Sequence, residues 1–157
     1  CVAALAQDAT AIAMLPQPFV TTAQAKNDQI RVALDLNQEW AAACEAEGRD
    51  GKLITGVAVV RSEFADAHPE AVDAFLGHYR ESVEFVKANT DEAAALVGGY
   101  DIVPEAVAKK ALPACNITFV DGADMKAQLS GYLEVLADQN ADAVGGKLPG
   151  DDFYYGA

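Results

Sequence analysis

Residues 11–25 have the sequence AIAMLPQPFVTTAQA, and this stretch decides the predicted fold. The apolar run that ends at Leu15 predicts a short buried strand, which Pro16 ends because proline cannot donate to a sheet ladder. Pro18 suits the first turn of a helix, where its missing N–H costs nothing. The pattern therefore predicts a strand whose carboxyl end leads into the amino end of a helix, and ligands of open α/β sheets bind at such points. A purely structural strand–turn–helix is the alternative interpretation.

Uncharged polar side chains gather at this predicted turn. Gln17, Thr21 and Thr22 can each donate and accept hydrogen bonds, and Pro18 lies between them. Unpaired N–H groups at the start of the helix favour an acceptor or an anion there. The sequence therefore predicts that these four residues line a ligand-binding cleft.

Two residues outside this stretch are further candidates for ligand contact. Trp40 is predicted on the first turn of a helix, where its indole can wall a cleft and donate through its N–H. Packing is the alternative role for Trp40. Thr55 precedes Gly56 inside a predicted strand, where glycine permits close approach by a ligand or by a neighbouring helix.

The remaining pattern predicts few strands and many helices. Strands are predicted at 11–15, 30–36 and 53–60, with a short extended piece at 117–120, and helices at 2–7, 18–26, 37–44, 69–89, 90–97, 104–113 and from 121 onward. The helix at 69–89 is predicted to be the longest or second longest, with Phe75, Leu76, Tyr79 and Val83 buried. A parallel sheet buried on both faces needs more strands than these, so the strands are expected to pair with an amino-terminal half supplied from outside this sequence.

Composition narrows the class of protein. The chain has 157 residues, 52% of them hydrophobic, and a net charge of -13, which disfavours nucleic acid and anionic membrane surfaces as partners. It shows neither a membrane-spanning apolar run nor the pattern of a signal peptide, and its start is interpreted as the edge of a longer chain. Cys1, Cys44 and Cys115 allow at most one disulfide; Cys44 and Cys115 either form it or are two buried thiols.

No catalytic or metal-binding pattern stands out. His68 and His78 are the only histidines, and they do not converge on one helical face. Nucleophile-elbow, C-x-x-C and P-loop motifs are absent from the sequence. The sequence therefore predicts no catalytic residues, no metal and no cofactor.

Four segments carry a resemblance to a known family. LPQPFVTTAQAKN at 15–27, RVALDLNQEW at 31–40, TGVAVVRSEFADAHPEAVDAFL at 55–76 and VGGKLPGDDFYY at 144–155 resemble, in order and spacing, the substrate-binding proteins of ABC importers. The resemblance is to the group that handles nitrate, sulfonates, taurine and thiamine pyrimidine precursors. It runs from about residue 2 to residue 155 and corresponds to the carboxyl-terminal half of such proteins.

The resemblance implies an α/β fold: the helix-rich portion of a two-lobed, type II periplasmic-binding-protein fold that is incomplete without its amino-terminal half. Residues 1–50 would end the second lobe, and residues 51–157 would return to the first. The implied function is the extracytoplasmic solute-binding component of an ABC importer, either periplasmic or a cell-surface lipoprotein whose signal lies upstream. Its implied partners are a small polar or anionic solute, the transporter permease and the missing amino-terminal half, with no nucleic acid.

Two alternatives belong to other functional classes. The first is an enzyme similar to the thiamine pyrimidine synthases, which share the family's fold but use a cysteine-rich iron motif that this sequence does not contain. The second is a small stand-alone domain that binds a protein partner. The resemblance favours the non-enzymatic solute-binding role over both.

Overall fold

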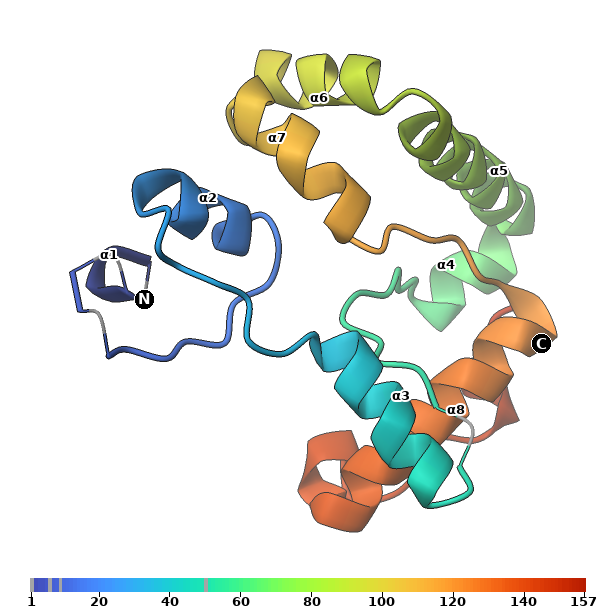
Figure 1. Cartoon of the computed structure of the whole chain (residues 1–157). Helices are drawn as coiled ribbons and strands as arrows, with labels where there is room; N and C mark the ends of the chain where they lie inside the picture. The colour runs from blue at the N-terminus through green and yellow to red at the C-terminus, as the bar shows by residue number, and fades with distance from the viewer. Residues whose placement is uncertain (1, 6, 9, 50) are drawn as a thin grey trace. The chain divides into compact units, whose positions relative to one another are not determined.

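Every regular element that the structure describes is helical. The computed structural model describes residues 2–5, 7, 8, 10–49 and 51–157, and these form no strand or β-bridge (Figure 1). The prediction of an α/β, two-lobed periplasmic-binding-protein fold is therefore wrong. The segments predicted as strands lie in irregular chain, apart from Leu36, which begins a helix.

The predicted strands fail because nothing in the described chain pairs with them. A strand satisfies its backbone groups only through a neighbouring strand, whereas a helix does so within itself. No turn or loop hydrogen bond among the described residues involves residues 53–60. Many apolar side chains of these segments face solvent, with Ile12 97% and Val59 85% exposed, and others such as Leu53 and Ile54 are half-buried. The β-branched pattern is present, but the partner that would make it a sheet is not among the described residues.

Contacts divide the chain into two units. Unit 1 comprises Cys1–Arg31 and Ser62–Phe119, and unit 2 comprises Val32–Arg61 and Val120–Ala157. The helices of unit 1 are α1 (Val2–Leu5), α2 (Phe19–Lys26), α4 (Ser62–Ala67), α5 (Pro69–Ala88), α6 (Thr90–Gly99), α7 (Glu105–Ala111) and the 3₁₀ turn η1 (Leu112–Ala114). Those of unit 2 are α3 (Leu36–Ala46), α8 (Gly122–Gln139), η2 (Ala141–Val144) and η3 (Asp151–Phe153). The lobe boundary predicted between residues 50 and 51 stays a prediction.

Small side chains form most of the core of unit 1. Helix α6 packs against α7 and α5, and α7 also contacts α2. The buried side chains on α2, α6 and α7 are mainly alanines: Ala23, Ala93, Ala94, Ala108 and Ala111. Alanine lets helix backbones approach closely and favours the helix itself, so these three helices pack with little side-chain volume between them.

Helix α5 confirms one prediction and corrects another. It spans 20 residues and is the longest helix in the described chain, as the periodicity predicts. Of the four residues predicted to be buried, Val83 is buried, Leu76 is half-buried, and Phe75 and Tyr79 are exposed. Phe75 instead stacks on Tyr79, which meets the edge of Phe119. The stripe is apolar as predicted, but the described chain covers only part of it.

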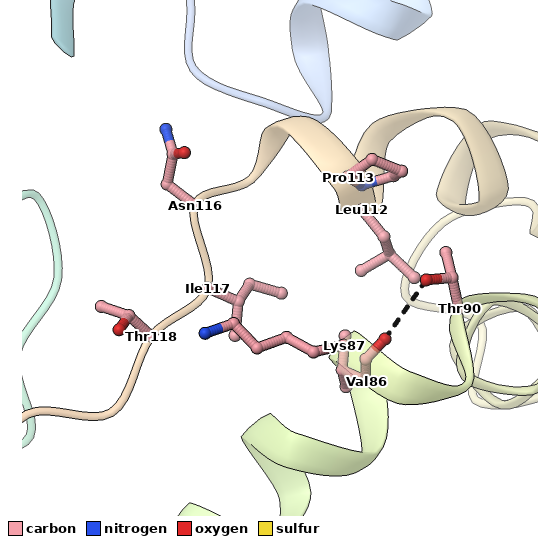
Figure 2. Close-up of a pocket in the computed structure, with 8 residues that line it drawn as sticks. All are labelled: Val86, Lys87, Thr90, Leu112, Pro113, Asn116, Ile117 and Thr118. Atoms are coloured by element: carbon pink, nitrogen blue, oxygen red, sulfur yellow. Dashed lines mark hydrogen bonds between the residues drawn. The ribbon is translucent and has the colours of Figure 1, made fainter.

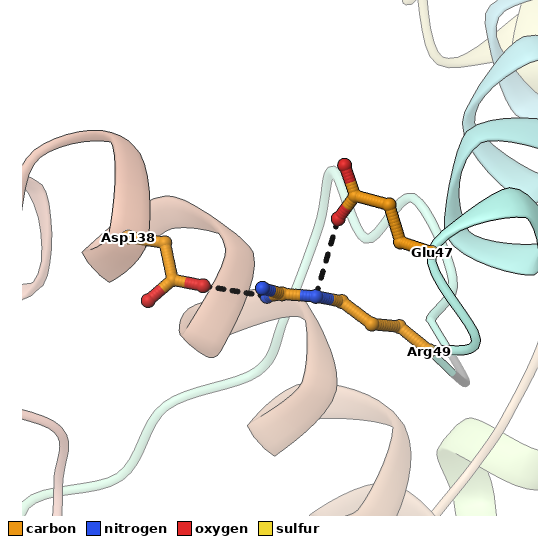
Figure 3. A network of polar contacts seen from close by, with 3 residues as sticks. All are labelled: Glu47, Arg49 and Asp138. Carbon is orange, nitrogen blue, oxygen red and sulfur yellow. Dashed lines mark ion pairs between the residues drawn. The ribbon is translucent and has the colours of Figure 1, made fainter.

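Unit 2 is held together by contacts between α3, its carboxyl-terminal loop and α8. The rings of Trp40 and Tyr132 lie 5.3 Å apart. Arg49 forms ion pairs with Asp138 at 2.6 Å and with Glu47 at 3.2 Å (Figure 3). The hydrogen bond and charge of Asp138 raise the pKa of Arg49 above its ordinary value. These groups are partly exposed, so the ion pairs orient the loop more than they stabilise the fold.

The carboxyl-terminal tail docks on α8 through an aromatic side chain. Tyr154 is buried, and the Ser130 hydroxyl donates to its phenolic oxygen at 3.2 Å. Lys126 lies over the same ring and pairs with Asp151. Phe153 is exposed, so Tyr154 alone is the buried anchor.

Candidate functional site

The predicted ligand residues at the start of α2 lie together in unit 1. We call Pro16, Gln17, Pro18, Thr21 and Thr22 the Gln17 turn. Gln17 Oε1 accepts from the Thr21 hydroxyl at 2.9 Å and from the Thr21 N–H at 3.3 Å. Because a backbone N–H can only donate, this bond requires the oxygen of the Gln17 amide at that position. Gln17 therefore bonds the first turn of α2 through its amide oxygen, which leaves the NH₂ group of the same amide outside these two bonds.

The backbone of the Gln17 turn corrects one part of the sequence argument. Phe19 N–H and Val20 N–H both donate to Pro16 O, and Thr22 N–H donates to Pro18 O. Together with the Thr21 bond to Gln17, these contacts use the N–H groups of the first helical turn. The prediction that unpaired N–H groups at the start of α2 would attract an anion is therefore wrong, because these groups are already bonded. The donor that it presents is the Gln17 side-chain amide, in an orientation set by buried Thr21.

The other two predicted ligand residues belong to unit 2. Trp40 Nε1 is buried without a hydrogen-bond partner in the described chain, and a Cβ on Gly51 would lie 3.4 Å from it. This indole edge is covered by its own unit, and its ring packs on Tyr132. Thr55 is exposed in the irregular segment that precedes α4. The structure thus brings Gln17, Pro18, Thr21 and Thr22 together, while the ligand roles of Trp40 and Thr55 stay predictions.

Unit 1 also contains an open groove that the sequence argument did not identify. It has a volume of about 520 Å³ and is lined by Val86, Lys87, Thr90, Leu112, Pro113, Asn116, Ile117 and Thr118 (Figure 2). We call it the Lys87 groove. Its residues come from the end of α5, the start of α6 and the chain after α7. In the sequence, only the position of Lys87 off the apolar stripe of α5 pointed to this groove. The residues at 112–118 that complete it are distant in the sequence, so their proximity to Lys87 could not be predicted.

A second groove in unit 1 is mostly apolar. Phe85, Leu96, Val97, Tyr100 and Ile102 are among the residues that line its volume of about 470 Å³ between α5 and α6. His78, Glu81 and Ser82 also line it. The Ser82 hydroxyl donates to the His78 backbone carbonyl at 2.8 Å, a bond within α5 itself, so the groove presents a mainly apolar surface.

The remaining candidates for site chemistry are possible metal ligands and the cysteine thiols. In the described chain, no cluster of His, Cys, Asp and Glu side chains is arranged to hold a metal ion. Cys44 and Cys115 are free thiols; Cys44 is buried, and partial burial raises the pKa of the Cys115 thiol. Cys1 lies outside the described residues. Among the described helices, none combines the length and apolarity needed to span a bilayer.

No protein-family model matches the chain, no curated protein matches its sequence, and no solved structure matches its fold. The features of the chain that bear on its function are the resemblance of the four sequence segments and the geometry of the Gln17 turn.

Proposed function

We propose that the chain is part of the extracytoplasmic solute-binding component of an ABC importer and binds a small polar solute through the Gln17 turn. The observation that supports this is the orientation of the Gln17 amide. Its oxygen is occupied by Thr21, so its NH₂ group is held ready to donate to an oxygen of the solute. The proposal concerns what the chain binds and does not depend on a two-lobed α/β fold.

The geometry narrows the class of solute. A neutral amide donor beside a fully bonded helix start suits an acceptor oxygen or ring nitrogen, whether on a sulfonate, on nitrate or on a pyrimidine. The turn itself carries no charged side chain, so recognition there depends on hydrogen-bond geometry rather than on charge. We propose that the transporter permease then receives the solute from this protein.

The substitution Gln17→Glu should change the affinity for the solute without lowering the stability of the fold. Glutamate keeps an oxygen for Thr21 but replaces the two amide donors with a second oxygen. We expect the melting temperature to be unchanged or slightly higher, because a carboxylate also suits a helix amino end. We expect binding of the solute to weaken about two- to tenfold, the effect of one lost hydrogen bond of ~0.5–1.5 kcal/mol. Titration calorimetry with nitrate, taurine and the thiamine pyrimidine measures this.

A second variant, Thr21→Val, tests the same site. Thr21→Val removes the hydroxyl that orients Gln17, and because Thr21 is buried it should lower both affinity and melting temperature. If Gln17→Glu bound the solute as tightly as the unmodified chain, the site would not be this turn. Failure of all three probes to bind to the unmodified protein would contradict the proposed class of solute.

We propose further that an amino-terminal part of the same protein covers residues 53–60. Support comes from their apolar, exposed valines, from the absence of any turn or loop hydrogen bond to them among the described residues, and from the resemblance. Hydrophobic burial drives such association, and backbone groups without partners direct it toward another polypeptide.

Val59→Asp tests this partner. Val59 is 85% exposed, so the substitution should leave the melting temperature of this chain unchanged. Co-expression with the amino-terminal part should show loss of co-purification, because a carboxylate would be buried at the contact. Leu96→Asp, an exposed apolar position on α6, is the control that should co-purify normally. Equal recovery of Val59→Asp and the unmodified chain would exclude residues 53–60 from the contact.

A further inference from the structure

The Lys87 groove carries a positive charge in a strongly acidic chain. The sequence has 24 Asp and Glu residues against 11 Lys and Arg residues. Of the eight described residues that line the groove, Lys87 alone is charged, and none is a carboxylate. Arg49, Lys109 and Lys126 form ion pairs with carboxylates, whereas no ion pair of Lys87 is found among the described residues. An anion that enters this groove therefore meets an ammonium group that has no competing carboxylate partner.

The end of α5 does not need Lys87 as a cap. Phe85 O accepts from the Asn89 N–H at 2.8 Å and from the Asn89 side-chain amide at 3.2 Å. Val86 O accepts from the Thr90 hydroxyl at 3.4 Å (Figure 2). Other donors therefore serve two of the last carbonyl groups of α5, and the three ammonium protons of Lys87 stay available to a ligand.

The other walls of the groove define what kind of anion fits. Leu112, Pro113 and Ile117 contribute apolar surface, while Asn116 and Thr118 add neutral hydrogen-bonding groups on the same chain segment (Figure 2). A volume of about 520 Å³ lies in the range of small-molecule pockets, which combine apolar walls with a few polar groups. We propose that the Lys87 groove binds a small organic anion, with Lys87 holding its acidic group and the apolar wall contacting its hydrocarbon part.

This second site is independent of the solute proposed for the Gln17 turn. The two sites share no residue, and the Gln17 turn offers a neutral amide where the Lys87 groove offers a cation. A variant of one site should therefore leave binding at the other unchanged. Each of the two proposals can thus be contradicted without affecting the other.

Nuclear magnetic resonance titration of the whole ¹⁵N-labelled chain tests the groove. The probes are isovalerate and propane-1-sulfonate, with isovaleramide as the uncharged match to isovalerate. We expect both anions to shift the backbone amide signals of Thr90, Asn116 and Thr118, and we expect isovaleramide to shift them far less. Lys87→Gln should weaken anion binding about tenfold or more, since it removes a charged hydrogen bond, whereas Lys87→Arg should retain binding.

Lys110→Gln is the matched control, because it removes the same charge from exposed α7 outside the groove. Binding should survive in this variant and in Gln17→Glu. If Lys110→Gln and Lys87→Gln lost the same affinity for the anions, the effect would be a general attraction of anions to the chain, and the proposed site would be wrong. Shifts confined to other parts of the chain, equal binding of isovaleramide, or no shift with either anion would overturn it as well.

Discussion

Gly98→Ala is expected to destabilise the protein by about 1–2 kcal/mol, although alanine is the better helix former. Added at Gly98 on α6, a Cβ would lie 2.9 Å from the Cβ of Glu105 and 3.0 Å from its backbone nitrogen. A backbone atom cannot move aside as a flexible side chain can, so α6 and α7 would have to separate. Overpacking of this kind typically costs about 1–3 kcal/mol, which exceeds the ~0.5–1 kcal/mol that Gly→Ala contributes within a helix.

Gly77→Ala is the matched control for this prediction. Gly77 lies within α5, and a Cβ there would meet no atom within 4 Å. The same substitution should therefore stabilise the protein by ~0.5–1 kcal/mol. Urea unfolding followed by circular dichroism gives both values. Shifts of the same sign in the two variants would contradict the close packing of α6 on α7.

Val83→Ala is expected to cost about 1.5–2.5 kcal/mol of unfolding free energy. Val83 is only 4% exposed, and the substitution removes two buried carbons and leaves a cavity that α5 cannot fill. Val59→Ala makes the same chemical change at a position that is 85% exposed and should stay within about 0.5 kcal/mol of the unmodified chain. Chemical unfolding of both variants measures the difference. A cost at Val83 no larger than that at Val59 would mean that α5 buries a different face.

The helices of this protein are largely encoded by local sequence. Pro69 at the start of α5 and Thr90 at the start of α6 lie where the pattern predicts them, and α2 ends at Lys26 as predicted. Asp35 caps α3 by accepting a 2.9 Å hydrogen bond from the Asn37 N–H, so this helix begins at Leu36, one residue before its predicted start. A helix satisfies its own backbone and marks its ends with nearby residues, so a single sequence predicts it to within a few positions.

The sequence predicts only part of the candidate functional sites. Gln17 and Thr21 were predictable as a pair because residues four apart meet at a helix start. Which end of the Gln17 amide bonds to Thr21 could be known only from the three-dimensional contacts, which show that the oxygen is used and the NH₂ group is not. Lys87 and Asn116 are separated in the sequence, and only the packing of α5, α6 and η1 brings them to one groove.

Sequence alone determined, to within a few positions, where most helices begin and end, as well as which residues are apolar and how strongly acidic the chain is. Tertiary structure decided that the predicted strand segments stay irregular in the described chain, and which face of α5 is buried. Residues 53–60 show the physical reason: their β-branched pattern favours a strand, but a strand exists only when a second strand accepts its hydrogen bonds. Burial likewise depends on a neighbouring surface, so Val83 is covered while Phe75, on the same predicted stripe, faces solvent.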